Sequence, residues 1–346
     1  MWPIDRGRLA KRLRSAMPGA PTSPHPETKL AHPHARRVYT QLMETTGCGT
    51  AIVTPFRADG AIDEQSLRAL VHWQIEVGID FIVACGSTGE AATLDEDEWL
   101  DTIRIVIDAA AGRVPVWAGC THNATRTLLR HASLLSQIRG VDAILSANPY
   151  YNKPNQEGQY RHFLALAQAV DPIPVCLYNV PGRTAANLEP LTVVRLAEAA
   201  ANIQAIKEAS GNLAQIGKLI HRLPRSFKVF SGDDNLALAT IGIGAQGLIS
   251  VASNEAPAEV GNMIRAALRN DWSTARGLEA QYSTLFEANF WDANPGPVKT
   301  VLSLMGKCGE HLRLPLVPPD SGTRARLERA AADLGLLQRV PAMHAN

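Results

Sequence analysis

The sequence predicts a closed (β/α)8 barrel with a helical appendage at its C-terminal end. Three observations lead to this fold class. From Gly49 onward, short apolar or β-branched segments alternate eight times with segments of helical spacing. The strand candidates are apolar on both faces, as parallel strands covered by helices are. No G-x-G-x-x-G fingerprint follows the first of them, which argues against an open, doubly wound sheet.

The elements follow in order from the apolar runs and the turn residues between them. Strands are expected at Ala51–Thr54, Phe81–Ala84, Val114–Ala118, Ala143–Ser146, Val175–Tyr178, Ile203–Lys207, Lys228–Ser231 and Gly247–Val251. Helices are expected between them at Glu64–Val77, Asp95–Ala111, Ala124–Ile138, Gln156–Ala169, Glu189–Ala200, Leu213–Leu223 and Leu236–Ile241. The helical appendage would comprise Ala258–Leu268, Trp272–Ala288, Val298–Met305 and Ser321–Leu336.

Composition divides the chain into three regions. Residues 1–42 hold many prolines and carry eight Lys or Arg against two acids, so we expect a disordered extension, with a transit peptide as the alternative. Met43 is then a candidate start. Residues 43–255 would form the catalytic barrel, and residues 256–346 the C-terminal helical region.

The charge and cysteine content exclude several classes of protein. The 34 Lys and Arg residues nearly balance 33 Asp and Glu residues, which gives no electrostatic case for a nucleic-acid or membrane partner. The five cysteines are widely spaced and form no C-x-x-C pair, so neither a disulfide framework nor a zinc site is expected. We therefore expect a reducing, cytoplasmic location. No apolar run reaches membrane-spanning length.

Lys207 lies where a lysine is rarely found. It ends the apolar strand candidate Ile203–Lys207, and Ser210-Gly211-Asn212 then form the turn and cap of the next helix. Desolvation of an ammonium favours loss of its proton, and a neutral amine attacks a carbonyl to form a Schiff base. The alternative is a lysine that pairs with Glu208 and points to solvent.

Other polar residues follow the strand candidates, where a barrel of this kind places its chemistry. Gly86 and Gly89 flank two hydroxyl residues, a spacing that lets backbone N–H groups approach a small anion. The further candidates at strand ends are Ser87, Thr88, Tyr151, Tyr178, Arg183, Gly232 and Ile249. Each has a structural alternative: helix caps for the hydroxyls, loop or core packing for the tyrosines, and a surface cation for the arginine.

No metal is expected. Asp233 and Asp234 are adjacent acids in a turn without a clustered histidine, so both are interpreted as helix caps. His122 has no second His or Cys at ligand spacing.

Six motifs in order resemble the pyruvate-dependent class I aldolase superfamily, typified by the dihydrodipicolinate synthases and the N-acetylneuraminate lyases. The resemblance covers roughly residues 47–310. The motifs are G-S-T-G-E at 86–90, P-Y-Y-N at 149–152, Y-N-V-P-G-R-T at 178–184, I-K-E-A-S-G-N at 206–212, S-G-D-D at 231–234 and A-N-P-G-P-V-K at 293–299. The resemblance implies the TIM-barrel fold and a Schiff base on Lys207, with no other cofactor.

Arg183 favours the synthases within this superfamily. It follows Tyr178 by five residues, and in the synthases the arginine at this place is implied to hold the carboxylate of the second substrate. The implied reaction condenses pyruvate with L-aspartate 4-semialdehyde to 4-hydroxy-tetrahydrodipicolinate, the first committed step of lysine (diaminopimelate) biosynthesis. A sister aldolase for 4-hydroxy-2-oxoglutarate or a 2-keto-3-deoxy sugar acid remains the alternative, and a non-catalytic oxo-acid-binding barrel is a further one.

The resemblance also implies roles for the other site residues. The backbone N–H groups of Ser87 and Thr88 would bind the carboxylate of pyruvate, and Tyr178 would move protons through the Thr88 hydroxyl and Tyr151. Tyr151 would come from a neighbouring subunit of a homo-oligomer, usually a tetramer built as a dimer of dimers. The backbone carbonyls of Gly232 and Ile249 would complete the pocket.

Three departures from the family pattern bear on specificity and regulation. Ser87 stands where many synthases have a second threonine, and Ala185 replaces a common glycine. Asn123 and Tyr150 match the pocket through which lysine inhibits some members, but Trp99 and Thr127 fall where inhibited members have His and Glu. Loss of a carboxylate removes a partner for the lysine ammonium, so we expect weak or absent inhibition. Strong inhibition below millimolar lysine in a titration would contradict this.

Overall fold

The structure is a computed structural model that describes residues 44–337. Eight parallel strands form a closed barrel in chain order, because each strand pairs with the next and β8 pairs with β1. The strands are β1 (Gly47–Ala51), β2 (Phe81–Ala84), β3 (Val116–Gly119), β4 (Ala143–Ala147), β5 (Val175–Asn179), β6 (Ile203–Glu208), β7 (Lys228–Ser231) and β8 (Gly247–Ser250). The predicted fold class is confirmed.

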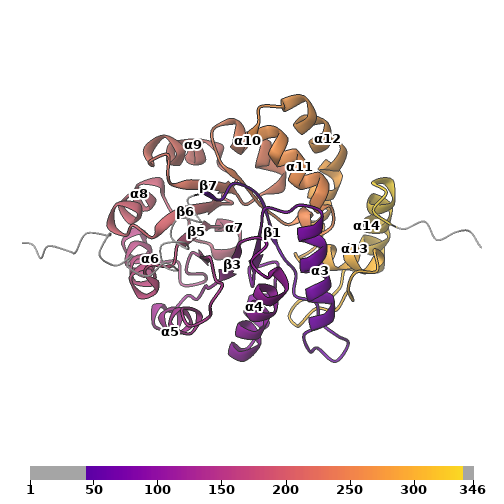
Figure 1. The fold of residues 1–346 in the computed structure, drawn as a ribbon, viewed down its shortest axis with the longest axis horizontal. Helices are drawn as coiled ribbons and strands as arrows, with labels where there is room; N and C mark the ends of the chain where they lie inside the picture. Colours follow the sequence, from indigo (N-terminus) through magenta and orange to yellow (C-terminus); the bar gives the residue numbers. More distant parts are fainter. Residues whose placement is uncertain (1–43, 338–346) are drawn as a thin grey trace, which may run out of the picture.

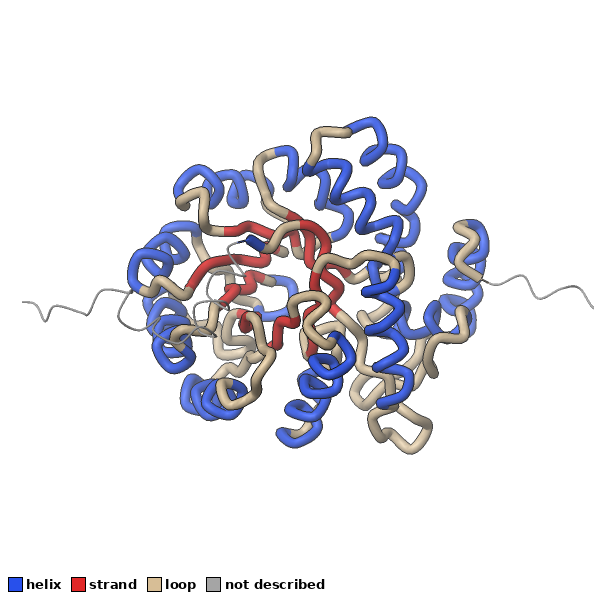
Figure 2. Tube along the Cα trace, in the orientation of Figure 1, coloured by secondary structure: helices blue, strands red, loops and turns tan. Residues whose placement is uncertain are grey.

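Helices surround the strands (Figures 1 and 2). Those between successive strands are α3 (Glu64–Glu76), α4 (Glu96–Ala110), α5 (Thr125–Leu135), α6 (Gln156–Val170), α8 (Pro190–Ala199), α9 (Leu213–Arg222) and α10 (Ala237–Gly242). Short helices add η2 (Ala91–Thr93), α7 (Pro181–Thr184), η3 (Asp234–Leu236) and η4 (Ala252–Asn254). Beyond β8 lie α11 (Pro257–Leu268), α12 (Trp272–Ala288), α13 (Gly296–Leu304) and α14 (Ser321–Asp333).

The first strand differs from its predicted range. The sequence predicted Ala51–Thr54, whereas β1 ends at Ala51. The side chain of Asn254 explains this end, because its Oδ1 accepts from the Val53 N–H at 3.1 Å and its Nδ2 donates to the Ala51 carbonyl at 2.9 Å. Backbone groups that a longer strand would use are therefore bonded to a side chain.

Aromatic rings fill the middle of the barrel. Phe81 stacks on Trp117 with 4.4 Å between ring centroids, and Phe230 meets both rings edge-on at 5.5 Å. Side chains from the other strands complete this interior core, which includes Tyr178 and Ile249. The barrel is thus a packed core and not a pore, so chemistry is confined to the strand ends.

The C-terminal helices pack on the barrel. α11 packs against β1, α12 against α11, and α14 against α12 and α13. Figure 1 shows α14 at the outer side of the molecule, away from the strands. Residues 1–42, interpreted as an extension or a transit peptide, lie outside the described residues. Within residues 44–337, no helix is long and apolar enough to span a bilayer.

Candidate active site

Lys207 and Tyr178 lie side by side at the ends of neighbouring strands. They are register partners in β6 and β5, and their side chains are 5% and 7% exposed. The Nζ of Lys207 lies 4.5 Å from the centre of the Tyr178 ring. Among the described residues, no carboxylate forms a salt bridge with Lys207. The lysine is therefore buried, as its position in a strand candidate predicted.

Glu208 does not pair with Lys207. Successive side chains of a strand point to opposite faces, and Glu208 faces away from the barrel interior. Its carboxylate accepts from Asn179 Nδ2 at 3.1 Å, the Ser210 N–H at 2.8 Å and Gln215 Nε2 at 3.2 Å. Burial raises the pKa of Glu208, and these donors oppose that rise. The alternative of a lysine paired with Glu208 in solvent is wrong.

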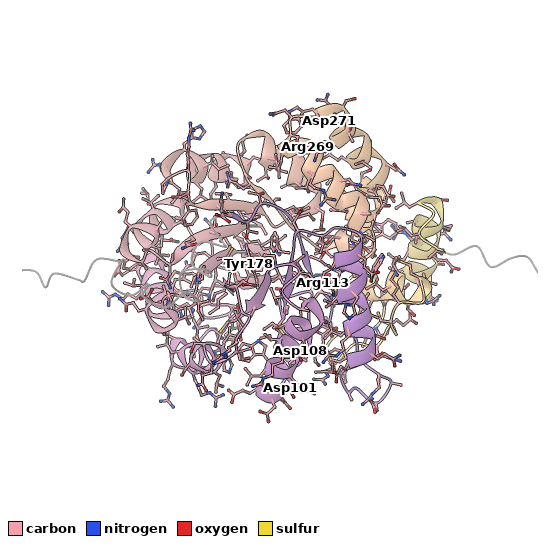
Figure 3. All side chains as sticks on the ribbon, in the orientation of Figure 1. Asp101, Asp108, Arg113, Tyr178, Arg269 and Asp271 are labelled. Atoms are coloured by element: carbon pink, nitrogen blue, oxygen red, sulfur yellow. The ribbon has the colours of Figure 1, made fainter. Side chains whose placement is uncertain are left out.

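The Tyr178 hydroxyl is available for proton transfer. Within the described part of the chain, nothing forms a hydrogen bond with this hydroxyl, so the alternative of a core tyrosine with a satisfied hydroxyl does not hold. Figure 3 shows Tyr178 near the centre of the molecule, whereas the labelled Asp101 and Asp108 lie on the outer helix α4. A phenol next to an amine can donate or accept a proton during carbonyl chemistry.

The loop after β2 presents two backbone donors. The Gly89 N–H donates to the Gly86 carbonyl at 3.1 Å and the Glu90 N–H to the Ser87 carbonyl at 3.2 Å. The N–H groups of Ser87 and Thr88 have no acceptor among the described residues. Such a pair of adjacent donors suits a small carboxylate.

The two hydroxyls of this loop have different surroundings. Ser87 is exposed, whereas Thr88 is buried and its Oγ1 accepts from Asn294 Nδ2 at 3.0 Å. Neither side chain caps a helix: η2 has no side-chain cap bond, and the next helix, α4, is capped by Asp95. The helix-cap alternative for Ser87 and Thr88 is therefore wrong.

Gly232 packs against the side chain of Lys207. A Cβ at this position would lie 2.9 Å from Lys207 Cε and 2.8 Å from Ala209 Cβ, so any larger residue would force the lysine side chain or its neighbour to move. Ile249 is fully buried in the interior core. The structure therefore places Gly232 against Lys207, at the end of the barrel where β7 finishes.

The two acids that follow β7 have separate roles. Asp233 accepts from the Asn235 N–H at 3.1 Å and caps η3, as predicted. Burial raises the pKa of Asp233, although the positive charge of Lys207 acts in the opposite direction. Asp234 is not a cap, because its carboxylate accepts from the Ser250 hydroxyl and the Val251 N–H. Nowhere in residues 44–337 do three or more His, Cys, Asp or Glu side chains gather in a way that could hold a metal ion.

Arg183 and Tyr151 are exposed residues near this end. Arg183 lies in α7, directly after β5. The chain turns here, and the Arg183 N–H donates a hydrogen bond to the Val180 carbonyl at 3.0 Å. Tyr151 is 87% exposed and has a positive φ of 73°. No described contact joins Tyr151 to Tyr178 within the chain.

Trp99, which stands at a position linked to lysine inhibition in the family, is buried. Its Nε1–H donates to the Gly119 carbonyl at 2.9 Å.

Comparison with known proteins decides the family. The model of the dihydrodipicolinate synthetase family matches residues 44–334. The chain belongs to this family. It is 61% identical over 299 residues to the 4-hydroxy-tetrahydrodipicolinate synthase of Acidobacterium capsulatum and 54% identical over 298 residues to that of Koribacter versatilis; both matches cover 86% of this chain and 99% of the relative.

A solved structure of this family gives the same picture. The chloride-inhibited dihydrodipicolinate synthase of Acinetobacter baumannii in complex with pyruvate is 41% identical and superposes with a TM-score of 0.82. That match covers 84% of this chain and 99% of the other chain. The family resemblance given by the six motifs is confirmed.

The sequence analysis did not predict which residues hold the loop at 86–90, after β2, in place. Asn294 reaches Thr88 from 206 residues away, and Lys299 forms a fully buried ion pair with Glu90. Both belong to the motif at 293–299, which contributed to the resemblance but received no role. The available signal was a lysine in a mostly apolar segment, because a lysine that is buried with such a segment must find a buried partner.

Proposed function

We propose that this chain condenses pyruvate with L-aspartate 4-semialdehyde to give 4-hydroxy-tetrahydrodipicolinate, for lysine and diaminopimelate biosynthesis. One observation carries the proposal: Lys207 is buried beside Tyr178 without a carboxylate partner in the described chain. A buried amine beside a phenol is placed to add to the carbonyl of a small oxo acid. Relatives named 4-hydroxy-tetrahydrodipicolinate synthase support the same reaction.

The first half-reaction activates pyruvate. The neutral amine of Lys207 adds to the ketone carbon, and loss of the ketone oxygen as water leaves an iminium. The iminium withdraws electrons from the methyl group, which loses a proton and becomes an enamine nucleophile. The Tyr178 hydroxyl moves protons onto and off these intermediates; the centre of its ring lies 4.5 Å from Lys207 Nζ. The lysine itself is the electron sink, so no further cofactor is required.

The loop at 86–90 binds the pyruvate carboxylate. The Ser87 and Thr88 N–H groups, which have no acceptor in the described chain, donate to it. The Thr88 hydroxyl relays protons between Tyr178 and Tyr151. The carbonyls of Gly232 and Ile249 complete the pocket, and the absence of a side chain on Gly232 leaves room for the adduct.

The second half-reaction joins the semialdehyde. The enamine carbon attacks the aldehyde carbon, whose oxygen takes up a proton. The Arg183 guanidinium binds the carboxylate of this substrate with two parallel hydrogen bonds. The amino group of the substrate then attacks the iminium carbon, and the ring closes as Lys207 leaves as a free amine. Lys207 is thereby regenerated.

We also propose a homo-oligomeric enzyme, a dimer of dimers, located in the cytoplasm. The exposed Tyr151 supports an assembly in which this side chain serves a neighbouring subunit. All five cysteines are free thiols, and four of them are buried, which suits a reducing compartment. Its partners are then its two small-molecule substrates and its own copies, with neither nucleic acid nor membrane.

The test measures pyruvate consumption with and without L-aspartate 4-semialdehyde, coupled to a dihydrodipicolinate reductase that oxidises NADPH. Turnover should require both substrates and disappear in Lys207→Ala. The matched control is Lys218→Ala, which removes an exposed lysine of α9 and should leave turnover unchanged. Borohydride-trapped pyruvate on Lys207 without turnover on the semialdehyde would assign the chain to a sister aldolase instead.

A further inference from the structure

We propose that Asn294 is a positioning residue of the pyruvate site, which acts by orienting the Thr88 hydroxyl. The inference deepens the proposed function and rests on it. Asn294 lies between α12 and α13, far in sequence from every residue assigned a role in the reaction. Its Nδ2 nevertheless donates to Thr88 Oγ1 at 3.0 Å, and both side chains are buried.

The direction of this hydrogen bond matters for proton transfer. A hydroxyl has one O–H donor and lone pairs for two acceptors. The amide of Asn294 donates, so it occupies a lone pair of Thr88 and does not compete for the hydroxyl proton. The Thr88 O–H therefore remains available as a donor toward substrate or a relay partner. Without Asn294, the hydroxyl would rotate among its staggered positions, and its alignment would be lost.

Lys299, the last residue of the motif at 293–299, also contacts the loop at 86–90. Lys299 forms an ion pair with Glu90, and both side chains are fully buried. The same Lys299 Nζ donates to the His311 carbonyl at 2.9 Å, and the Arg313 N–H donates to Glu90 Oε2 at 3.3 Å. The C-terminal segment thus fixes the last residue of the loop, while Asn294 fixes its central hydroxyl. The helical appendage is in this way a structural part of the proposed pyruvate site.

A purely structural role explains Asn294 less well. Its Oδ1 is buried and accepts no hydrogen bond from the described chain, so the side chain leaves one polar atom unsatisfied. An unsatisfied buried carbonyl lowers stability, and an apolar residue here would avoid that loss. Within the described chain, the hydrogen bond that the Asn294 side chain does form is its donation to Thr88.

The experiment is a double-mutant cycle in the full-length chain. The rate of the borohydride-trapped pyruvate adduct is measured against pyruvate concentration for wild type, Asn294→Ala, Thr88→Val and the double variant. This readout needs no second substrate. We expect Asn294→Ala to lower the second-order rate constant of adduct formation about five- to tenfold, as for one buried hydrogen bond. In the Thr88→Val background, the same substitution should have no further effect.

Asn289→Ala is the matched control. Asn289 is also a buried asparagine of the C-terminal region, donates its Nδ2 to the buried Glu255 at 2.8 Å and has an unsatisfied Oδ1. Asn289→Ala should leave adduct formation unchanged, because Asn289 makes no contact with Thr88. If Asn294→Ala does not fold, Asn294→Asp keeps the side-chain shape while replacing the donor with an acceptor, and should also slow adduct formation.

Three results would overturn the inference. Equal losses in Asn289→Ala and Asn294→Ala would show general destabilisation, and additive losses in the cycle would show that Asn294 does not act through Thr88. Unchanged adduct formation in Asn294→Ala would exclude any role. A wild-type protein that forms no adduct would instead contradict the proposed function itself, so the two failures are distinguishable.

Discussion

At the scale of single residues, successive side chains of a strand point to opposite faces, which places the proposed catalytic residues on one face and structural hydrogen bonds on the other. Tyr178 and Lys207 face the barrel interior, whereas the residues that follow them, Asn179 and Glu208, hydrogen-bond each other on the opposite face. The alternation itself could be predicted from the sequence. The partners of Glu208 could not, because they include Gln215, which reaches it only after the following helix packs back on the strand.

A variant of Arg183 tests whether the chain acts as the proposed synthase or as a sister aldolase. Arg183→Ala should lower kcat/KM for L-aspartate 4-semialdehyde on the order of 100-fold, because a bidentate, charge-assisted contact is lost. Pyruvate adduct formation should stay near that of wild type, and Arg183→Lys should recover only part of the loss. Steady-state kinetics with both substrates check this. Arg222→Ala, at the far end of α9, is the control, and a tolerant Arg183 would favour the sister aldolase.

His162 makes stability depend on pH. Burial is the main cause that lowers the pKa of His162 from 6.5 to about 4, and the charge of His122 adds to it. Its Nδ1 bonds with the Thr125 hydroxyl at 2.9 Å, and its Nε2 has no partner in the described chain. Between these two pKa values the unfolded chain binds more protons, so this contribution is lost as the pH falls from 6.5 through 4. At pH 5 the loss is about 2 kcal/mol.

The variant His162→Asn tests this contribution. It keeps a group that can bond with Thr125 but cannot titrate. Urea unfolding at pH 7.5 and pH 5 should show a smaller decrease in the free energy of unfolding for the variant than for wild type. Identical decreases would show that His162 does not charge on unfolding.

At the scale of elements, the strand and helix order could be predicted because each element carries its own periodicity. The departures occur where a distant side chain or a turn decides the boundary. β1 ends early because Asn254 bonds its last residues, and α7 was not expected because four residues hold no periodicity. The contact of Asn294 with Thr88 has no local signal in either segment, so pattern reasoning could not place it.

The closing pair of strands depends on a glycine. At Gly247 in β8, a Cβ would lie 2.0 Å from the Gly47 carbonyl of β1, its register partner. Gly247→Ala should therefore lower the free energy of unfolding on the order of 3 kcal/mol, because the two strands must move apart. Gly277→Ala is the control: it has open space in α12 and should raise stability by about 1 kcal/mol. Equal effects in denaturant unfolding would contradict this account of barrel closure.

At the scale of the whole molecule, one chain does not bring all the expected catalytic residues together. Lys207 and Tyr178 meet inside the barrel, but Tyr151 points its ring into solvent and is 87% exposed. Burial of so large an aromatic surface stabilises an interface, and exposed aromatic side chains mark such contacts. A complete site in which Tyr151 takes part then needs a second copy.

Subunit mixing tests whether Tyr151 acts on its neighbour. Lys207→Ala and Tyr151→Phe should each be nearly inactive alone. If Tyr151 serves the partner, a mixed dimer holds one site with both substitutions and one site with neither. Random reassembly of equal amounts should then restore about a quarter of wild-type turnover. If Tyr151 served its own chain, every site in the mixed dimer would keep one defect. Turnover after co-refolding, compared with each variant refolded alone, therefore decides between a site built by two chains and a site built by one.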